Sequence, residues 1–187
     1  MEEDIDLYLD SAKDDMGKAI THLEGQLAKI RAGKAMPSML DGLRVEYYGS
    51  PTPINQVASV STPDARTLVI SPWEKNIIPE IERAIINSDL GLSPQNDGEI
   101  VRLSIPVLTE ERRKDLVRQA KGEAENSKVR VRQIRKETND ELKKLQKDGA
   151  SEDAIKGAEG KVQDLTDSFS KKIDDLLAVK EKDIMTV

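Results

Sequence analysis

Residues 99–116 read EIVRLSIPVLTEERRKDL, and this stretch spans the border between two kinds of sequence. Its first seven residues largely alternate between apolar and polar side chains, as in a half-buried β-strand. Pro106 ends that pattern. Three residues later Thr109 precedes Glu110 and Glu111, the N-cap and acidic first turn typical of an α-helix. The stretch therefore predicts a strand, a short linker and a helix.

The prolines divide the rest of the chain in the same way. All eight lie within residues 34–107, and none lies in 1–33 or 108–187. Because proline is excluded from helix interiors, the two flanks are free to form long helices, whereas the middle consists of strands and turns. We therefore predict a discontinuous helical domain of residues 1–32 and 108–187, with a second domain, residues 33–107, inserted into it.

Apolar residues in the flanks recur at spacings of three and four, which predicts three amphipathic helices. The first is expected to end near Ala32-Gly33. The second runs from Thr109 to about Asp148-Gly149, a length of about 60 Å at the usual helical rise. The third begins after Ser151. Its predicted buried positions are Ile155, Ala158, Val162, Leu165, Phe169, Ile173, Leu176 and Val179. Three such stripes predict an elongated antiparallel three-helix bundle.

The inserted region has the patterns of a small β/α/β domain, so the predicted fold class is α+β. The four predicted strands are LRVEYY (43–48), INQVASV (54–60), TLVIS (67–71) and EIVRLSI (99–105). IIPEIERAIINSDLG (77–91) is predicted to form one helix that ends before Gly91. Trp73 is expected to be a partial cap on the core of this domain rather than a base-stacking platform.

The composition excludes several kinds of chemistry. The chain has no cysteine and a single histidine, His22, which excludes disulfides, thiolate or histidine metal clusters and serine–histidine pairs. No Gly-rich phosphate loop occurs, no apolar stretch approaches the length of a membrane span, and the acidic N-terminus is not a secretory signal. We therefore expect a soluble cytoplasmic protein that is not an enzyme and needs no metal or cofactor.

Only the second predicted helix carries a net positive charge. The chain has 29 basic and 35 acidic side chains, yet residues 108–148 hold 13 basic against 9 acidic ones, and every other segment is net acidic. At 100° per residue, four basic side chains fall in a stripe about 60° wide, with Arg130 outside it. The four are Lys121, Lys128, Arg132 and Arg135. Either these charges pair with acids on neighbouring helices, or they form a surface that docks on phosphate backbones.

Five segments resemble one protein family. They are KIRAGKAMPSMLDGLRVEYYGSPTPINQVASV (29–60), ARTLVISPWEK (65–75), AIINSDLGLSP (84–94), IPVLTEERRKDLVRQAKGEAE (105–125) and VRQIRKETND (131–140). In order and spacing they resemble bacterial ribosome recycling factors over residues 5–185. The resemblance implies an L-shaped molecule in which a two-stranded hinge joins the bundle to the small domain. It also implies a monomer that docks on large-subunit rRNA after termination. With elongation factor G and GTP, such a factor splits the subunits and releases mRNA and tRNA.

The resemblance also implies roles for particular residues. It assigns rRNA contacts to Arg31, Arg113, Arg132 and Arg135, and the stripe adds Lys121 and Lys128 as rRNA-binding candidates. It assigns the hinge to Ala32, Gly33, Lys34, Pro106 and Val107. At Lys34 the family pattern usually has arginine, so the charge is kept but the planar fork is absent.

Two other functions remain open on the sequence alone. The chain could be a helical adaptor whose basic stripe pairs with an acidic protein, or an RNA chaperone with no fixed docking site. Binding to large subunits that falls linearly with the logarithm of salt concentration would favour rRNA docking over both.

Overall fold

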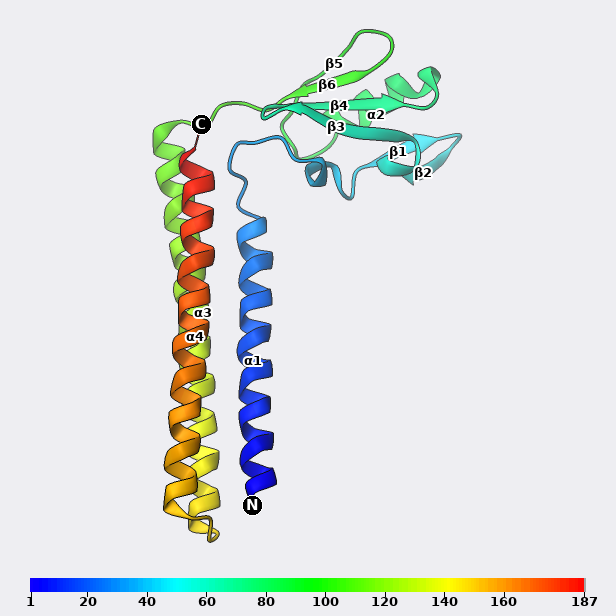
Figure 1. The fold of residues 1–187 in the computed structure, drawn as a ribbon. Coiled ribbons are helices and arrows are strands. Elements are labelled where there is room, and N and C mark those ends of the chain that lie inside the picture. Colours follow the sequence, from blue (N-terminus) through cyan, green and yellow to red (C-terminus); the bar gives the residue numbers. More distant parts are fainter. Residues whose placement is uncertain (187) are drawn as a thin grey trace. The chain divides into compact units, whose positions relative to one another are not determined.

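The structure, a computed structural model, describes residues 1–186 and divides into two compact units. One unit combines residues 1–32 with the chain from Thr109 onward, and the other is Gly33–Leu108. The first unit consists of α1 (Glu2–Ala28), α3 (Glu110–Lys147) and α4 (Glu152–Met185). Within it α1 and α4 run in one direction and α3 runs in the other (Figure 1). The predicted antiparallel three-helix bundle is confirmed.

The two predicted helix starts are capped as expected. The Thr109 side chain accepts a hydrogen bond from the Arg112 N–H at 3.1 Å, and Ser151 accepts one from the Ala154 N–H at 3.1 Å. Each cap satisfies a backbone donor that has no partner within its helix. Helices α3 and α4 therefore begin at the residues that the sequence predicted.

The predicted end of the first helix was wrong by four residues, because α1 ends at Ala28 rather than at Ala32-Gly33. The Lys29 N–H bonds to the carbonyls of Gln26 and Leu27, and the Ile30 N–H bonds to Leu27. These short-range bonds close the last turn early. Gly33 therefore lies in the connecting segment and not at the helix cap.

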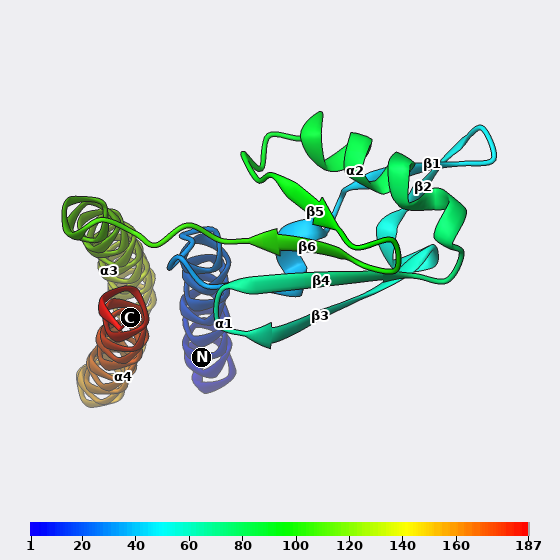
Figure 2. The same cartoon turned by 90° about the horizontal axis from the view of Figure 1, so that it is seen from above.

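The bundle core is formed by one buried stripe from each helix, and Figure 2 shows the three helices nearly end-on. In α4 the stripe follows the prediction only in part: Leu165 and Leu176 are half-buried, and Thr166 is buried in place of Leu165. Further along, Val179 is 70% exposed and Ile184 is fully buried. Val179 lies about 240° around the helix from Ile173, whereas Ile184 lies about 20° from it. Val179 therefore faces solvent, and the buried stripe continues at Ile184.

The second unit contains two antiparallel sheets, one α-helix and three short 3-10 turns (Figure 1). The strands of the first sheet are β1 (Arg44–Tyr47) and β2 (Ser50–Pro53). The second has the order β3-β4-β6-β5, formed by β3 (Ala58–Asp64), β4 (Thr67–Pro72), β5 (Pro94–Asn96) and β6 (Val101–Ser104). The helix is α2 (Ile78–Ile86). This confirms the α+β class.

Three details of this unit differ from the prediction. Strands β2 and β5 were not predicted, because they contain prolines, which are tolerated at sheet edges. The expected strand at 54–60 begins instead with a 3-10 turn, Ile54–Gln56, before β3. Helix α2 ends at Ile86 with Asn87 as its C-cap, earlier than the predicted end near Gly91.

The small unit has a core of its own. Its helix buries Ile78, Ile81 and Ile85 against strand residues such as Leu68 and Val101. Trp73 is 66% exposed and is not among the partly buried residues that pack on this core, so the structure does not support its predicted role as a cap. The bundle core and this core share no residue.

Candidate nucleic-acid interface

The two lysines of the basic stripe join α3 to α4. The Lys128 ammonium lies 2.6 Å from the Asp174 carboxylate, and the Lys121 ammonium lies 4.0 Å from that of Glu181. The Lys128 side chain is only 29% exposed. For this pair of lysines the structure therefore supports the first interpretation, in which basic side chains pair with acids on the neighbouring helix.

The two arginines of the stripe are differently placed. The Arg132 guanidinium contacts Glu125 of the same helix at 2.7 Å, with both side chains at least half exposed. Arg135 donates to the neutral side-chain amide of Gln163 at 3.4 Å. Exposed ion pairs contribute about 0–1 kcal/mol, so a phosphate could replace Glu125 at little cost. The Gln163 contact leaves the charge of Arg135 available.

Arg130 lies on the other side of α3, facing α1. It lines an open groove of about 430 Å³ between the two helices, with Asp15, His22 and Glu123 also on its walls. The buried Ser127 hydroxyl, one turn away, donates to the Ala19 carbonyl of α1 at 3.4 Å. Arg130 is thus separated from the stripe by the buried face of α3.

The other two predicted rRNA contacts are not members of the stripe. Arg31 is exposed and follows the end of α1. Arg113 is half-buried in the first turn of α3, and its Nε is buried with no hydrogen-bond partner among residues 1–186. At the usual rise it lies about 12 Å along the helix from Lys121 and about 22 Å from Lys128. The structure does not bring all six predicted residues into one cluster.

The two segments predicted as a hinge meet at one turn of the small unit. The Ala35 N–H donates to the Ala65 carbonyl and the Ile105 N–H donates to the Arg66 carbonyl, both at 2.8 Å. Gly33 has a positive φ of 72° and packs against the Leu108 side chain. Sequence reasoning missed Leu108, although an apolar residue directly before a predicted helix cap often makes a packing contact.

The turn that holds both segments is itself braced by a carboxylate. The Asp64 side chain accepts a hydrogen bond from the Arg66 N–H at 2.9 Å. This backbone donor, and a further bond from the Thr67 side chain, lower the pKa of Asp64 below its usual range. The charged form of Asp64 therefore stabilises the turn.

Residues 1–186 contain no group of three histidine, aspartate or glutamate side chains placed to hold a metal ion. Over the same residues, the helices are too short or too polar to cross a membrane.

Comparison with known proteins decides the family. The family model described as ribosome recycling factor matches residues 23–185. The chain belongs to the ribosome recycling factor family. The recognition based on TEERRKDL and the other segments is therefore confirmed.

Relatives in this family match along the whole chain. The chain is 58% identical to the ribosome-recycling factor of Cytophaga hutchinsonii over 185 residues, covering 99% of this chain and 100% of that protein. It is 54% identical to that of Flavobacterium psychrophilum over 187 residues, covering 100% of both.

Solved structures of ribosome recycling factors are also similar. A solution structure matches with a TM-score of 0.75 and 38% identity, covering 98% of each chain. The T. thermophilus ribosome recycling factor, described with E. coli elongation factor G bound to the E. coli post-termination complex, matches with a TM-score of 0.62. That match has 46% identity and covers 97% of this chain and 99% of the other. These likenesses agree with the α+β fold described above.

Proposed function

We propose that this chain recycles ribosomes after termination. Its bundle docks on large-subunit rRNA, and with elongation factor G and GTP it splits the subunits and releases mRNA and tRNA. Family membership supports the overall role, and the T. thermophilus relative described with elongation factor G on a post-termination complex supports the partners. The protein acts in the cytoplasm as a monomer.

The observation that carries the docking surface is the state of the two arginines on the side of α3 next to α4. Arg132 and Arg135 present guanidinium groups whose contacts within the chain are an exposed carboxylate and a neutral amide. Guanidinium groups bind phosphate oxygens through two parallel N–H bonds, which positions a protein on RNA without reading sequence. Lys121 and Lys128 have α4 partners and contribute mainly to the positive potential there.

The chain itself catalyses no reaction in this proposal. The free energy for splitting comes from GTP hydrolysis by elongation factor G. Ala32, Gly33, Lys34, Pro106 and Val107 form the hinge. The bundle remains on the rRNA while the small unit is displaced, so the segments between them must accommodate the movement.

A splitting assay tests the proposal. Post-termination ribosomes, elongation factor G from the same organism and GTP are mixed with the protein, and light scattering follows subunit dissociation. We expect splitting that requires all three components. The double variant Arg132→Ala/Arg135→Ala should split more slowly at limiting protein concentration, because docking is weakened.

Arg130→Ala is the matched control, since it removes the same charge from the opposite side of α3. Splitting that proceeds equally well without elongation factor G, or a loss of activity in Arg130→Ala equal to that of the double variant, would contradict the proposal.

A further inference from the structure

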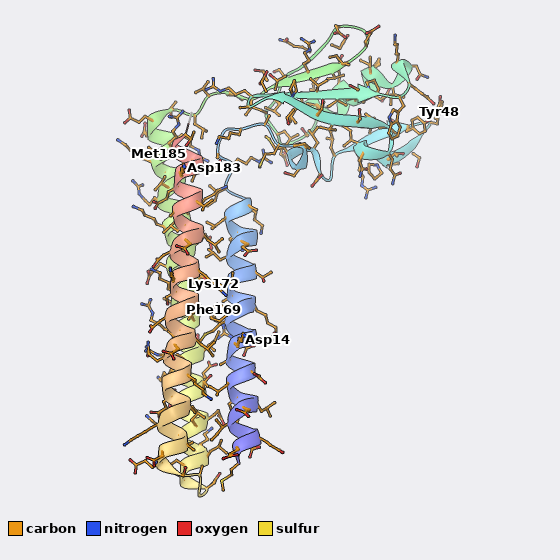
Figure 3. The ribbon with its side chains drawn as sticks, viewed as in Figure 1. Asp14, Tyr48, Phe169, Lys172, Asp183 and Met185 are labelled. Carbon is orange, nitrogen blue, oxygen red and sulfur yellow. The ribbon has the colours of Figure 1, made fainter. Side chains whose placement is uncertain are left out.

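The turn between β1 and β2 presents an exposed tyrosine in an unusual backbone conformation (Figure 3). Tyr48 has a φ of +49°, the only positive value at a non-glycine position in residues 1–186, and it is 75% exposed. With Gly49, at φ +80°, it forms the two-residue turn of a hairpin in which both positions require positive φ. Asparagine, aspartate or glycine usually takes the first position, so tyrosine is unfavourable there.

The Tyr48 ring is nevertheless held in place. Its hydroxyl donates to one oxygen of the Glu74 carboxylate at 2.8 Å, and the Tyr47 hydroxyl donates to the other oxygen at 3.0 Å. The two rings meet edge to face, with centroids 4.5 Å apart. Tyr47 packs on the core of the small unit, and its hydrogen bond to the Glu74 carboxylate raises its pKa. The three residues, which we call the tyrosine–glutamate cluster, thus connect the core to an exposed ring.

Folding alone does not account for this arrangement. The chain has five aromatic residues, and two of them are in the cluster while a third, Trp73, precedes Glu74 and is 66% exposed. The Tyr48 ring is exposed, so its burial contributes little to folding stability, and its backbone conformation is unfavourable. A ring that is already held in place, however, loses little conformational entropy when a partner binds. A binding role explains why the Tyr48 ring is exposed to solvent and yet held in one position.

We propose that the tyrosine–glutamate cluster binds an arginine side chain of a basic protein. The guanidinium plane stacks on the exposed face of Tyr48, where the ring's negative face attracts it. The Glu74 carboxylate supplies the opposite charge. Each of its oxygens also keeps a second lone pair beyond the tyrosine hydrogen bond, so it can accept a hydrogen bond from the guanidinium group.

Charge favours a protein partner over RNA at this surface. Residues 33–108 carry 6 basic and 9 acidic side chains, and the cluster itself is anionic through Glu74. A phosphate backbone would be repelled here, in contrast to the α3 face. The inference goes beyond the proposed function, because it concerns a second surface whose partner need not be rRNA.

A peptide-binding experiment tests the inference with the full chain. The probe is a fluorescein-labelled peptide of alternating arginine and serine, and fluorescence anisotropy reports binding at low salt. Tyr48→Asn removes the ring but keeps a residue that tolerates positive φ. We expect it to weaken binding by about two- to fivefold, the effect of a cation–π contact at an exposed site. Glu74→Gln should also weaken binding, while Tyr48→Phe, which keeps the ring, should weaken it less than Tyr48→Asn.

Asp89→Asn is the matched control for charge, because it removes one exposed carboxylate elsewhere in the small unit. It should bind the peptide as the wild type does. Unchanged binding in Tyr48→Asn would overturn the inference, as would a loss in Asp89→Asn equal to that in Glu74→Gln. Equal affinity for the lysine counterpart of the peptide would also count against it. Binding of single-stranded oligouridylate that disappears in Tyr48→Asn would overturn it too, because the ring would then stack on bases instead.

Discussion

A side-chain carbon placed on Gly33 would lie 2.7 Å from Cγ of Leu108. This is closer than side-chain carbons approach one another, so the two connecting segments touch at a point that only glycine permits. Gly33 also has a φ of +72°, which other residues rarely adopt. The contact is therefore specific on both sides: a glycine in one segment and a branched apolar side chain in the other.

The first prediction concerns this contact. Gly33→Ala should force the Leu108 side chain to move and should slow subunit splitting, while affinity for the large subunit stays within a few fold of wild type. Leu108→Ala removes the obstacle, so the double variant should be less impaired than the sum of the single variants implies. Contacting residues typically couple by about 0.5–3 kcal/mol. Splitting rates and large-subunit affinities measured for all four proteins give this coupling.

Two results would contradict this prediction. Strict additivity would mean that the Gly33 backbone conformation matters and the Leu108 contact does not. A decrease in large-subunit affinity in proportion to the decrease in splitting would mean that the connecting segments act in docking rather than as a hinge.

The second prediction is that the bundle folds without the small unit. A protein in which a short Gly/Ser linker replaces residues 33–108 retains the three buried stripes, and the two cores share no residue. Far-UV circular dichroism should show a helical protein that unfolds in one cooperative transition, because the bundle has a hydrophobic core of its own. A gradual, non-cooperative transition would indicate that the small unit is needed for the bundle to form.

How well the sequence predicted each element depended on whether a local signal marked its ends. Both ends of α3 followed from Thr109 and Asp148-Gly149, because a cap and a break are local chemistry. The end of α1 did not, since Gly33 marks the close contact with Leu108 and not the helix terminus. Strands β2 and β5 were not predicted because they contain proline. Proline is tolerated in an edge strand because one side of that strand has no neighbour to accept a hydrogen bond from an N–H group.

The candidate interface was predictable only in part, for a related reason. Helical periodicity correctly separated Arg130 from the α4-facing side of α3, because the period is a property of one helix. The acids that pair with Lys121 and Lys128 come from α4, and their positions depend on how the two helices pack. No pattern within residues 108–148 could therefore show that these two lysines already have partners.

The third prediction concerns acid stability of the small unit. The folded-state pKa of Asp64 is lowered by the Arg66 N–H, and that of Asp97 is lowered by the N–H groups of Ile100 and Glu99. Depressed pKa values mean that both carboxylates stabilise the folded state above about pH 4, their usual unfolded pKa, and that this contribution is lost as pH falls through the lower folded values.

Denaturant unfolding, monitored by Trp73 fluorescence at several pH values, measures this pH dependence of stability, because the chain's single tryptophan lies in the small unit. Asp64→Asn and Asp97→Asn should be less stable than wild type at neutral pH, and the difference should shrink below about pH 4. A difference that stays constant with pH would mean that these variants act through packing rather than through the carboxylate charge.

The fourth prediction concerns the arginines of the α3 face. Arg132→Ala and Arg135→Ala should each weaken binding to large subunits, and each should reduce the salt slope of the binding constant by about one for every phosphate that is no longer bound. Arg132→Lys keeps the charge but not the planar fork, so it should keep the slope and bind with somewhat lower affinity. Titrations of large subunits at several salt concentrations measure both quantities. An unchanged slope in both alanine variants would mean that these arginines bind no phosphate.

The last prediction separates the lysines of this face from its arginines. Lys121→Ala and Lys128→Ala remove side chains that pair with Glu181 and Asp174, so they should change the salt slope less than the arginine variants do. Their effect on folding stability should be at most about 1 kcal/mol, as for other solvent-accessible ion pairs. The same salt titrations, together with denaturant unfolding, provide the measurement. If the lysine variants reduced the slope as much as the arginine variants, the α4 carboxylates would have to release both lysines on docking, and the division of roles on this face would be wrong.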